Sequence, residues 1–194
     1  MIYGIGRNYV AHAKELGNQV PQAQGDPMVF FKPPASIVLS GEKVKLPEFS
    51  KNVQFELELA FRFDEDLNVG EICVANDLTA RDVQREAQEA KAPWCLAKGF
   101  KQSCGLGNWV SAQKHELQNL ELRLTLNGRV AQHGFTKDMI FKVSTLATYL
   151  ISRFPVQPGD IVLTGTPEGV GTVKSGDIVV AEIVGVSKAE WTYE

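Results

Sequence analysis

The feature that most constrains the fold of this chain is a strict alternation of apolar and other side chains between Val53 and Phe63. Every odd position in these eleven residues is apolar, and the even positions hold Gln54, Glu56, Glu58, Ala60 and Arg62. A period of two is typical of a β-strand that presents one apolar face to a core. A strand of this length needs partners on both sides, so a sheet-based fold is expected.

Several further elements can be predicted from turn and end signals. Short apolar runs between turn residues predict strands at residues 1–5, 28–32, 72–75, 120–126, 129–132, 161–163 and 178–180. Asn127-Gly128 predicts a tight hairpin turn, because both turn positions need positive φ. Helices are expected over Tyr9–Leu16, from Thr79 to before Pro93, and from Met139 to Ile151. Thr79-Ala80-Arg81-Asp82 has the form of a capping box for the second helix. These elements do not follow strict β-α-β order, which favours a strand-rich α+β fold with antiparallel hairpins.

Composition narrows the class of protein. The chain has 194 residues, of which 44% are hydrophobic and 22% charged, values typical of one globular domain spanning residues 1–194. The three cysteines form no C-x-x-C pair, and no apolar run reaches the length of a membrane helix. A net charge of −3 argues against a nucleic-acid partner. We therefore expect a cytoplasmic protein without a membrane or nucleic-acid partner, and an enzyme is the first hypothesis.

Two glutamates on one strand face raise the question of a metal. Glu56 and Glu58 project the same way about 6.6 Å apart, and their charges repel by about 2.5 kcal/mol at an effective dielectric of 20. Either this face is a solvated stripe in which Arg62 relieves the repulsion, or a divalent cation lies between the carboxylates. Asp77, at the end of the next predicted strand, is either a turn residue or a third ligand. Three carboxylates would suit Mg²⁺ or Mn²⁺ better than Zn²⁺.

Other polar residues have both a functional and an ordinary interpretation. His12 and Glu15 share one face of the first predicted helix, either as a surface pair or as a base oriented by a carboxylate. Lys98 lies in an apolar run, where it either extends to solvent or supplies a charge to an anionic site. Gly4-x-Gly6 lacks the third glycine of a dinucleotide-binding loop.

Taken together, the motifs of this chain resemble those of the fumarylacetoacetate hydrolase family, in its small branch of acylpyruvate hydrolases and oxaloacetate decarboxylases. The similarity runs nearly end to end. Its motifs are Gly6-Arg7-Asn8-Tyr9, His12, Glu15, Phe31-Lys32-Pro33, Glu56-Leu57-Glu58-Leu59, residues 76–84 (NDLTARDVQ), Pro93-Trp94, Lys98, Phe100, Gly159-Asp160, residues 163–171 (LTGTPEGVG) and Gly176-Asp177.

The resemblance implies a mixed β-roll with a few flanking helices and a homodimer. It also implies metal-binding carboxylates at Glu56, Glu58 and Asp77, usually for Mg²⁺, with Mn²⁺ or Ca²⁺ as alternatives. The family's water-activating dyad falls on His12 and Glu15 and its active-site lysine on Lys98, while Arg7, Gln84 and Thr166 match positions that contact the substrate.

The function expected from this resemblance is metal-dependent cleavage of the carbon–carbon bond of an acylpyruvate, a small 2-oxo acid. Oxaloacetate decarboxylation could use the same site, because it passes through the same enolate. Two alternatives stay open at this point. One is a hydratase, isomerase or decarboxylase of 2-oxo-dienoates, and the other is a binding module for dicarboxylates without catalysis.

Overall fold

The computed structural model describes residues 1–17 and 19–194, and β-strands dominate this part of the chain. The largest sheet has eight strands in the order β2-β1-β13-β6-β7-β9-β3, with β10 also paired to β7. Its strands are β1 (Ile2–Gly6), β2 (Met28–Lys32), β3 (Ile37–Leu39), β6 (Leu57–Phe63), β7 (Val69–Asp77), β9 (Cys104–Leu106), β10 (Val110–Ser111) and β13 (Ile161–Leu163).

Two further sheets complete the strand structure. A five-stranded sheet has the order β12-β11-β15-β16-β4, and a three-stranded sheet has the order β14-β5-β8. Their strands are β4 (Lys43–Val44), β5 (Val53–Phe55), β8 (Thr79–Ala80), β11 (Glu121–Leu126), β12 (Arg129–Phe135), β14 (Gly171–Thr172), β15 (Ile178–Ile183) and β16 (Ser187–Tyr193). The predicted hairpin is confirmed, since β11 and β12 pair around Asn127 and Gly128 at φ 51° and 78°.

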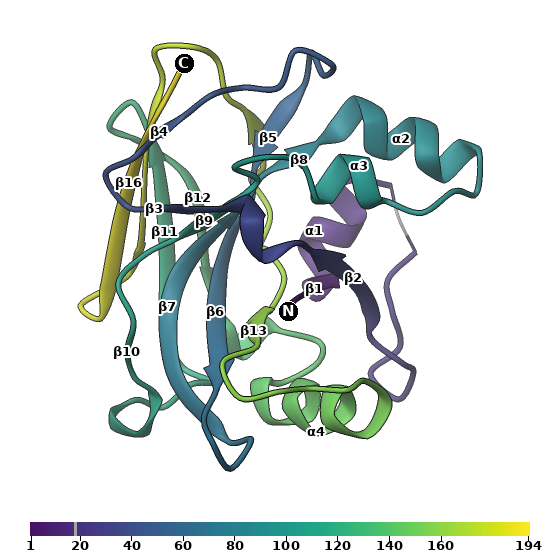
Figure 1. Ribbon diagram of the computed structural model, residues 1–194, viewed down its shortest axis with the longest axis vertical. Helices are drawn as coiled ribbons and strands as arrows, with labels where there is room; N and C mark the ends of the chain where they lie inside the picture. The colour runs from purple at the N-terminus through teal and green to yellow at the C-terminus, as the bar shows by residue number, and fades with distance from the viewer. Residues whose placement is uncertain (18) are drawn as a thin grey trace.

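The helices lie at the ends of the sheets. They are α1 (Val10–Glu15), α2 (Arg81–Glu89), α3 (Cys95–Lys98) and α4 (Val143–Arg153), with short 3₁₀ turns η1 (Pro34–Ser36), η2 (Ala112–Lys114) and η3 (Thr136–Asp138). In Figure 1, α2 and α3 lie together beside β5 and β8, and α4 lies at the lower end of the molecule. No helix in residues 1–17 and 19–194 is long and apolar enough to span a membrane.

The main hydrophobic core lies between the two larger sheets. Strand β11 packs on β6, and β15 and β16 pack on β7. The odd-numbered side chains of β6 enter this core together with Leu122, Val179 and Trp191. Ala60, on the opposite face of β6, belongs to a second buried cluster with Ile2 and Leu163. The predicted class, a strand-rich α+β fold with a mixed sheet, is confirmed: β1 pairs with β13 in parallel and β6 with β7 antiparallel.

The alternating segment differs from its prediction in two ways. The chain leaves the ladder at Glu56, so β5 and β6 are separate strands in two different sheets. Both faces of β6 are buried apart from Arg62, because β11 packs over the odd-numbered face and the even-numbered face belongs to other buried clusters. The solvated stripe is therefore wrong, and Arg62 pairs with Glu71 on the neighbouring strand instead of relieving Glu56 and Glu58.

Two helix starts also differ from their predictions. The Thr79 hydroxyl donates to the carbonyl of Asp77 and does not cap α2, which begins at Arg81 without a side-chain cap. The helix α4 begins at Val143, because residues 136–138 form a 3₁₀ turn and Met139 bridges to Tyr9. At Thr79 a local hydrogen bond takes the side chain that was expected to cap α2, and at Met139 a long-range bridge takes the backbone that was expected to begin α4.

Candidate metal centre

The interruption of the strand at Glu56 is stabilised by side-chain amides. The Glu56 N–H donates to Asn76 Oδ1 at 3.0 Å, and the Leu57 N–H donates to Gln132 Oε1 at 2.8 Å. Across the gap, the Asp77 N–H donates to the Glu56 carbonyl at 2.9 Å. Each buried N–H thus keeps a partner while the chain turns from one sheet to the next. The break places Glu56 directly beside Asp77.

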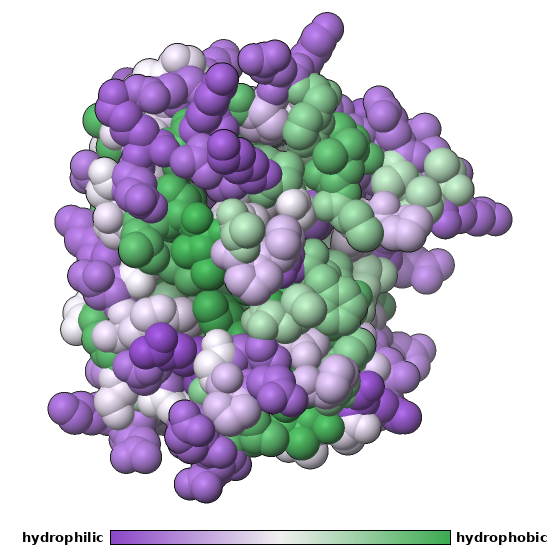
Figure 2. All heavy atoms as spheres, viewed as in Figure 1, coloured by the Kyte–Doolittle hydropathy of each residue, from purple (hydrophilic) through white to green (hydrophobic). Residues whose placement is uncertain are grey.

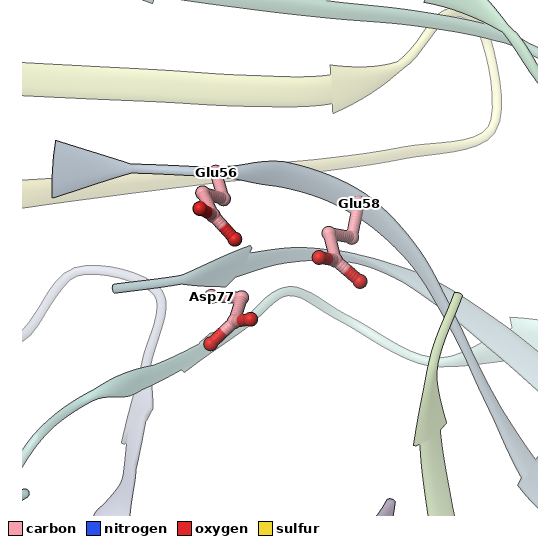
Figure 3. Close-up of side chains that lie close together, drawn as sticks. All are labelled: Glu56, Glu58 and Asp77. Carbon is pink, nitrogen blue, oxygen red and sulfur yellow. The ribbon is translucent and has the colours of Figure 1, made fainter. Parts of the chain in front are cut away.

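Three carboxyl groups meet at this break. Glu56, Glu58 and Asp77 each offer an oxygen, and these atoms all lie within 4.8 Å of one another. Figure 3 shows the three side chains turned toward a common space between their strands. All three residues are buried, with exposed fractions of 4%, 1% and 0%. Three like charges out of water are unfavourable unless cations compensate them.

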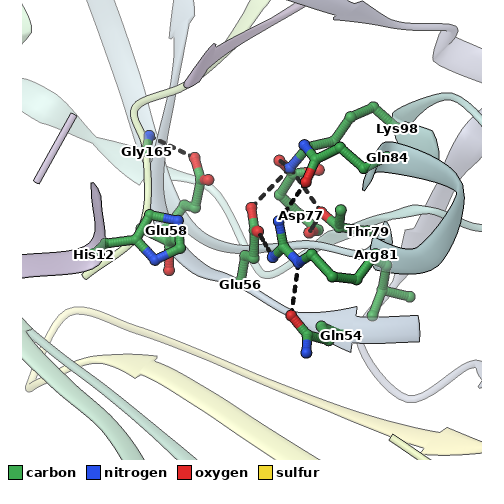
Figure 4. Close-up of polar contacts among 12 residues, drawn as sticks. His12, Gln54, Glu56, Glu58, Asp77, Thr79, Arg81, Gln84, Lys98 and Gly165 are labelled. Atoms are coloured by element: carbon green, nitrogen blue, oxygen red, sulfur yellow. Dashed lines mark hydrogen bonds and ion pairs between the residues drawn. The ribbon is translucent and has the colours of Figure 1, made fainter. Parts of the chain in front are cut away.

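Lys98 and Arg81 supply part of that compensation. Lys98 Nζ lies 2.7 Å from Glu56 Oε2, 2.6 Å from Asp77 Oδ2 and 2.7 Å from Thr79 Oγ1. The guanidinium of Arg81 forms an ion pair with the other oxygen of Glu56. In Figure 4 these cations approach from one side, while His12 and Gly165 lie on the other side, near Glu58. Lys98 does not extend to solvent, so the first of its two interpretations is wrong.

Arg81 is itself held by two glutamines. Its Nε donates to Gln54 Oε1 at 2.7 Å, and its Nη1 donates to Gln84 Oε1 at 2.5 Å. Gln84 is buried on the face of α2 that faces the carboxylates. The inward face of this helix is therefore polar, while its apolar residues Val83 and Ala87 are only half-buried.

Lys32 contributes charge to Asp77 without a hydrogen bond. Its Nζ is 2.7 Å from Asp77 Oδ1, and the residue is fully buried. Its donors go to the carbonyls of Leu78, Ser103 and Lys98. An ammonium has three protons, so none is left for Oδ1, which has no hydrogen-bond partner among the described residues. This buried oxygen therefore has a cation beside it but no hydrogen-bond donor, and a metal ion that bound it would share it with Lys32.

The pKa values of the carboxyl groups diverge. Burial opposes ionisation of Glu56, but Lys98 and Arg81 outweigh it and hold the pKa of Glu56 well below its usual range. Burial, with the charges of Asp77 and Glu56, raises the pKa of Glu58 well above its usual range. Burial would lower the pKa of Lys98, yet Asp77 and Glu56 together raise it. The cluster therefore lacks positive charge on the Glu58 side.

These observations fit a hard divalent cation. The donors are carboxylate oxygens, which suit Mg²⁺, Mn²⁺ or Ca²⁺. Within the part of the chain that the structure describes, Asp77 Oδ1 has Lys32 as a cation but no hydrogen-bond donor. Glu58 receives a backbone hydrogen bond from the Gly165 N–H at 2.7 Å but forms no ion pair with the same described residues. A cation between Glu58 and its neighbours would relieve the repulsion that raises the Glu58 pKa.

His12 and Glu15 form a pair on α1 in which only the histidine is buried. His12 Nδ1 lies 3.2 Å from Glu15 Oε2, and Glu15 Oε1 accepts from the Gly169 N–H at 3.0 Å. His12 is only 5% exposed whereas Glu15 lies at the surface, so the surface-pair interpretation does not hold for the imidazole. Because a carboxylate only accepts hydrogen bonds, Glu15 selects the tautomer of the neutral imidazole that carries its proton on Nδ1, which leaves the lone pair on Nε2.

A small cavity of about 30 Å³ joins these groups. This volume holds on the order of one or two water molecules. The sequence-predicted residues that line it are Arg7, His12, Glu56, Glu58, Gln84, Lys98 and Thr166. Thr166 Oγ1 accepts from Gln132 Nε2 at 2.8 Å, and Arg7 has a left-handed φ of 60°. Asp77 and Glu15 lie behind residues that line the cavity: Asp77 contacts Lys98, and Glu15 contacts His12.

Sequence reasoning missed the supporting residues. Lys32, Asn76, Arg81 and Gln132 all contact the carboxylates or the backbone that carries them. Lys32 could have been noticed as a lysine that ends an apolar strand before two prolines. Gln132 carries no local signal, because it looks like any polar residue of a hairpin strand.

Comparisons with known proteins agree with this architecture. The family model described as "Fumarylacetoacetate (FAA) hydrolase C-terminal" matches residues 1–192. An oxaloacetate tautomerase of Arabidopsis thaliana is 39% identical over 98% of this chain and 89% of its own length. An oxaloacetate decarboxylase of Dictyostelium discoideum is 36% identical over 95% of this chain and 89% of its own length.

A solved structure has the same fold as this chain. The fumarylpyruvate hydrolase of Pseudomonas aeruginosa, in complex with Mn²⁺ and pyruvate, superposes with a TM-score of 0.91. The two sequences are 29% identical, and the match covers 99% of this chain and 88% of that one. The similarity therefore includes almost the whole chain.

Proposed function

This chain belongs to the fumarylacetoacetate hydrolase family, and from that premise we propose that it is a divalent-metal-dependent hydrolase of acylpyruvates that also decarboxylates oxaloacetate. One arrangement carries the proposal. The buried carboxylates Glu56, Glu58 and Asp77 adjoin a cavity that also holds the base His12. Named relatives act on oxaloacetate and fumarylpyruvate, which supports a 2-oxo acid as the substrate.

Glu56, Glu58 and Asp77 are the proposed ligands, with Mg²⁺ as the proposed ion. When bound, the cation would supply Lewis acidity to the carboxylate and 2-oxo oxygens of the substrate and would fix their orientation. The Mn²⁺ complex of the Pseudomonas aeruginosa relative supports a divalent ion in this family. Arg7, Gln84 and Thr166 surround the same cavity and are the proposed contacts to the substrate.

In the proposed hydrolysis, His12 acts as the general base. Its Nε2 takes a proton from a water molecule, whose oxygen attacks the acyl carbonyl carbon. The carbon–carbon bond then breaks, and its electron pair moves to the CH₂ carbon of the pyruvate part. The products are a carboxylic acid and the enolate of pyruvate. His12 returns the proton to that carbon, which yields pyruvate and restores the neutral imidazole.

Lys98 stabilises the charge that develops in this reaction. Its ammonium is fixed by Glu56, Asp77 and Thr79, so it needs no reorganisation when the enolate forms. A preorganised charge in a water-poor site is worth more than the same charge in water. Decarboxylation of oxaloacetate yields the same enolate by loss of CO₂ and needs no attacking water. The proposal therefore requires His12 for hydrolysis and Lys98 for both reactions.

Tautomerisation of oxaloacetate is a second candidate. It is favoured by the name of the Arabidopsis thaliana relative. The reaction moves a proton between carbon 3 and the 2-oxo oxygen through the enolate of oxaloacetate itself and breaks no carbon–carbon bond. We retain the hydrolase as the first candidate because His12, oriented by Glu15, lines the cavity where it can activate a water molecule, although the same base could serve a tautomerase.

A substrate panel tests the proposed function. The purified protein, with Mg²⁺, Mn²⁺ or EDTA, is given acetylpyruvate, fumarylpyruvate, oxaloacetate and a 2-oxo-dienoate, with enol absorbance and pyruvate both measured. Pyruvate formed from acylpyruvates in a metal-dependent way supports the hydrolase. Loss of enol absorbance without pyruvate favours the tautomerase, conversion of the dienoate alone favours the hydratase or isomerase, and tight oxalate binding without turnover favours a binding module.

Three further assignments accompany this function. We propose that residues 1–194 act as one catalytic domain, since the family match spans nearly all of them. A homodimer and a cytoplasmic location are proposed as well. The free cysteines Cys73, Cys95 and Cys104 support a reducing compartment. Light scattering of the purified chain at two concentrations tests the dimer.

A further inference from the structure

We propose that a groove between β2 and α3 binds the acyl arm of the substrate and selects acylpyruvates whose acyl group is apolar and larger than acetyl. This inference rests on the proposed function, because the carboxyl end of the substrate must be held at Glu56, Glu58 and Asp77. It adds the substrate class, which the family assignment leaves open.

The groove continues directly from the small cavity. It has a volume of about 680 Å³, within the range of small-molecule sites. The cavity and the groove share four wall residues, namely Arg7, Phe30, Gln88 and Trp94. The cavity itself is too small for a whole acylpyruvate, so the acyl arm must extend past these residues into the groove.

The glycines of β1 make the groove possible. Gly4 is paired with Phe30 and Gly6 with Met28 on the neighbouring strand. A Cβ on Gly4 would lie 2.2 Å from the Phe30 ring, and a Cβ on Gly6 would lie 3.2 Å from Met28 Sδ and 3.6 Å from Trp94. Because these two glycines have no side chain, Phe30, Met28 and Trp94 can pack against β1 and form the apolar lining. This explains Gly4-x-Gly6, which is not a nucleotide loop.

Phe30 stands at the boundary between the polar and apolar parts. Lys98 Nζ lies 4.7 Å from the centre of its ring, and the ring of Trp94 lies 6.3 Å away on the groove side. A cation over an aromatic face is attracted to it. The same ring thus faces the charged cluster and the groove, so a substrate lying along it has its polar end at the carboxylates and its apolar end beside Trp94.

The side chains that line the groove determine which kind of acyl arm it can bind. It is mostly apolar, with Met28, Phe30, Phe31, Pro93 and Trp94 as its main side chains. Figure 2 shows apolar side chains gathered over the part of this face where β2 and α3 lie in Figure 1. An aliphatic or aromatic arm would bury apolar surface here, which is favourable in proportion to the area removed from water.

Arg7 lies where the cavity meets the groove. Its Nε is buried and has no hydrogen-bond partner among the described residues. A donor at this place suits the oxygen of the acyl carbonyl, which lies between the 2-oxo acid end and the apolar arm of an acylpyruvate. The 2-oxo acid end, the acyl carbonyl and the apolar arm of such a substrate therefore match the carboxylates, Arg7 and the apolar groove in the same order.

Kinetics with arms of increasing size provide the test. We expect kcat/KM for hexanoylpyruvate and benzoylpyruvate to exceed that for acetylpyruvate by tenfold or more. Trp94→Ala should lower this ratio about tenfold, since the arm loses its largest contact. Leu96→Ala, an exposed leucine on the same helix outside the groove, is the matched control and should keep the ratio.

Binding measurements separate this inference from the proposed function. In the presence of Mg²⁺, calorimetry with pyruvate and 2-oxooctanoate should show at least tenfold tighter binding of the longer acid, and Trp94→Ala should abolish the difference. Equal affinities for the two acids, or turnover of acetylpyruvate with no gain in kcat/KM for longer arms, would contradict the proposed role of the groove but not the hydrolase activity. Tighter binding of the longer acid without turnover of any acylpyruvate would retain the groove and overturn the hydrolase.

Discussion

The side chain of Gln132 accepts a hydrogen bond from the Leu57 N–H at 2.8 Å, between the two glutamates of the carboxylate cluster. The same side chain donates from Nε2 to Thr166 Oγ1 and to the Pro167 carbonyl, both at 2.8 Å. One buried amide of β12 thus connects the interrupted strand to the loop on the other side of the cavity. Its position couples the proposed metal ligands to a proposed substrate contact.

Gln132→Met should weaken Mg²⁺ binding about tenfold and raise KM, because Leu57 N–H loses its acceptor and the strand can shift. Leaving such a group unpaired costs about 1–3 kcal/mol, or roughly 2–12 °C in the unfolding midpoint at this chain length. Calorimetry with Mg²⁺ and differential scanning fluorimetry measure the two effects. Gln113→Met, at an exposed position, is the control. An unchanged Mg²⁺ affinity in the first variant would show that the amide only stabilises the fold.

Glu56→Ala should remove metal-dependent turnover and weaken Mg²⁺ binding by about a hundredfold. The variant also leaves Lys98 and Arg81 without their shared partner, and breaking a buried ion pair costs about 3–5 kcal/mol. Glu56→Gln therefore accompanies it, since the amide preserves the shape and one of the two accepted hydrogen bonds while losing the charge. Glu65→Ala, in an exposed turn, should behave like the parent. Full turnover with Mg²⁺ in Glu56→Ala contradicts the proposed ligand set.

His12→Ala should lower acylpyruvate hydrolysis about 10²- to 10⁴-fold, the usual contribution of a general base. Oxaloacetate decarboxylation should fall less than tenfold, because it needs no activated water. Both rates are measured on one preparation by pyruvate release. His133→Ala removes an exposed histidine and serves as the control. Equal losses in the two reactions would show that His12 acts on the enolate and not on water.

Lys98→Met should bind Mg²⁺ at least as tightly as the parent but lose more than a hundredfold in kcat. In the parent, the ammonium holds oxygens of Glu56 and Asp77 that would otherwise be free for a cation. Without metal, the variant should unfold at a lower temperature because two buried carboxylates lose their partner. Added Mg²⁺ should restore most of this difference by mass action. If the added ion restores none of it, the ion does not bind between these carboxylates.

Asp82→Asn should reduce stability in a pH-dependent way. Partial burial raises the pKa of Asp82, but hydrogen bonds from Ser50, Lys51 and Val83 outweigh it and lower the pKa. A depressed folded pKa stabilises the protein above the unfolded value of about 3.9. That stability is lost as pH falls through the folded value. We expect the variant to melt about 2–4 °C lower at pH 7, with a smaller gap at pH 4. A gap that stays constant over this range would exclude the carboxylate as its cause.

Much of the local structure could be predicted from neighbouring residues alone. The hairpin at Asn127-Gly128 depends on the backbone freedom of two residues, and the strand from Leu57 to Phe63 depends on a period of two. Each of these two signals is contained in residues that lie within a few positions of one another in the sequence. The carboxylates Glu56, Glu58 and Asp77 were also recognisable, because their residue types stand out on predicted strands.

What the sequence determined by itself was therefore which segments form strands and which acidic side chains are the proposed metal ligands. Only the tertiary structure decided that the even face of β6 is buried, because burial depends on which side chains pack over that face of the sheet. Likewise, only the structure brings Lys32, Gln132 and Lys98 to carboxylates or backbone far away in the chain. Such contacts form when the sheets pack, and no local pattern encodes the partner of a buried charge or amide. The site thus consists of locally recognisable acids held by residues that are recognisable only after folding.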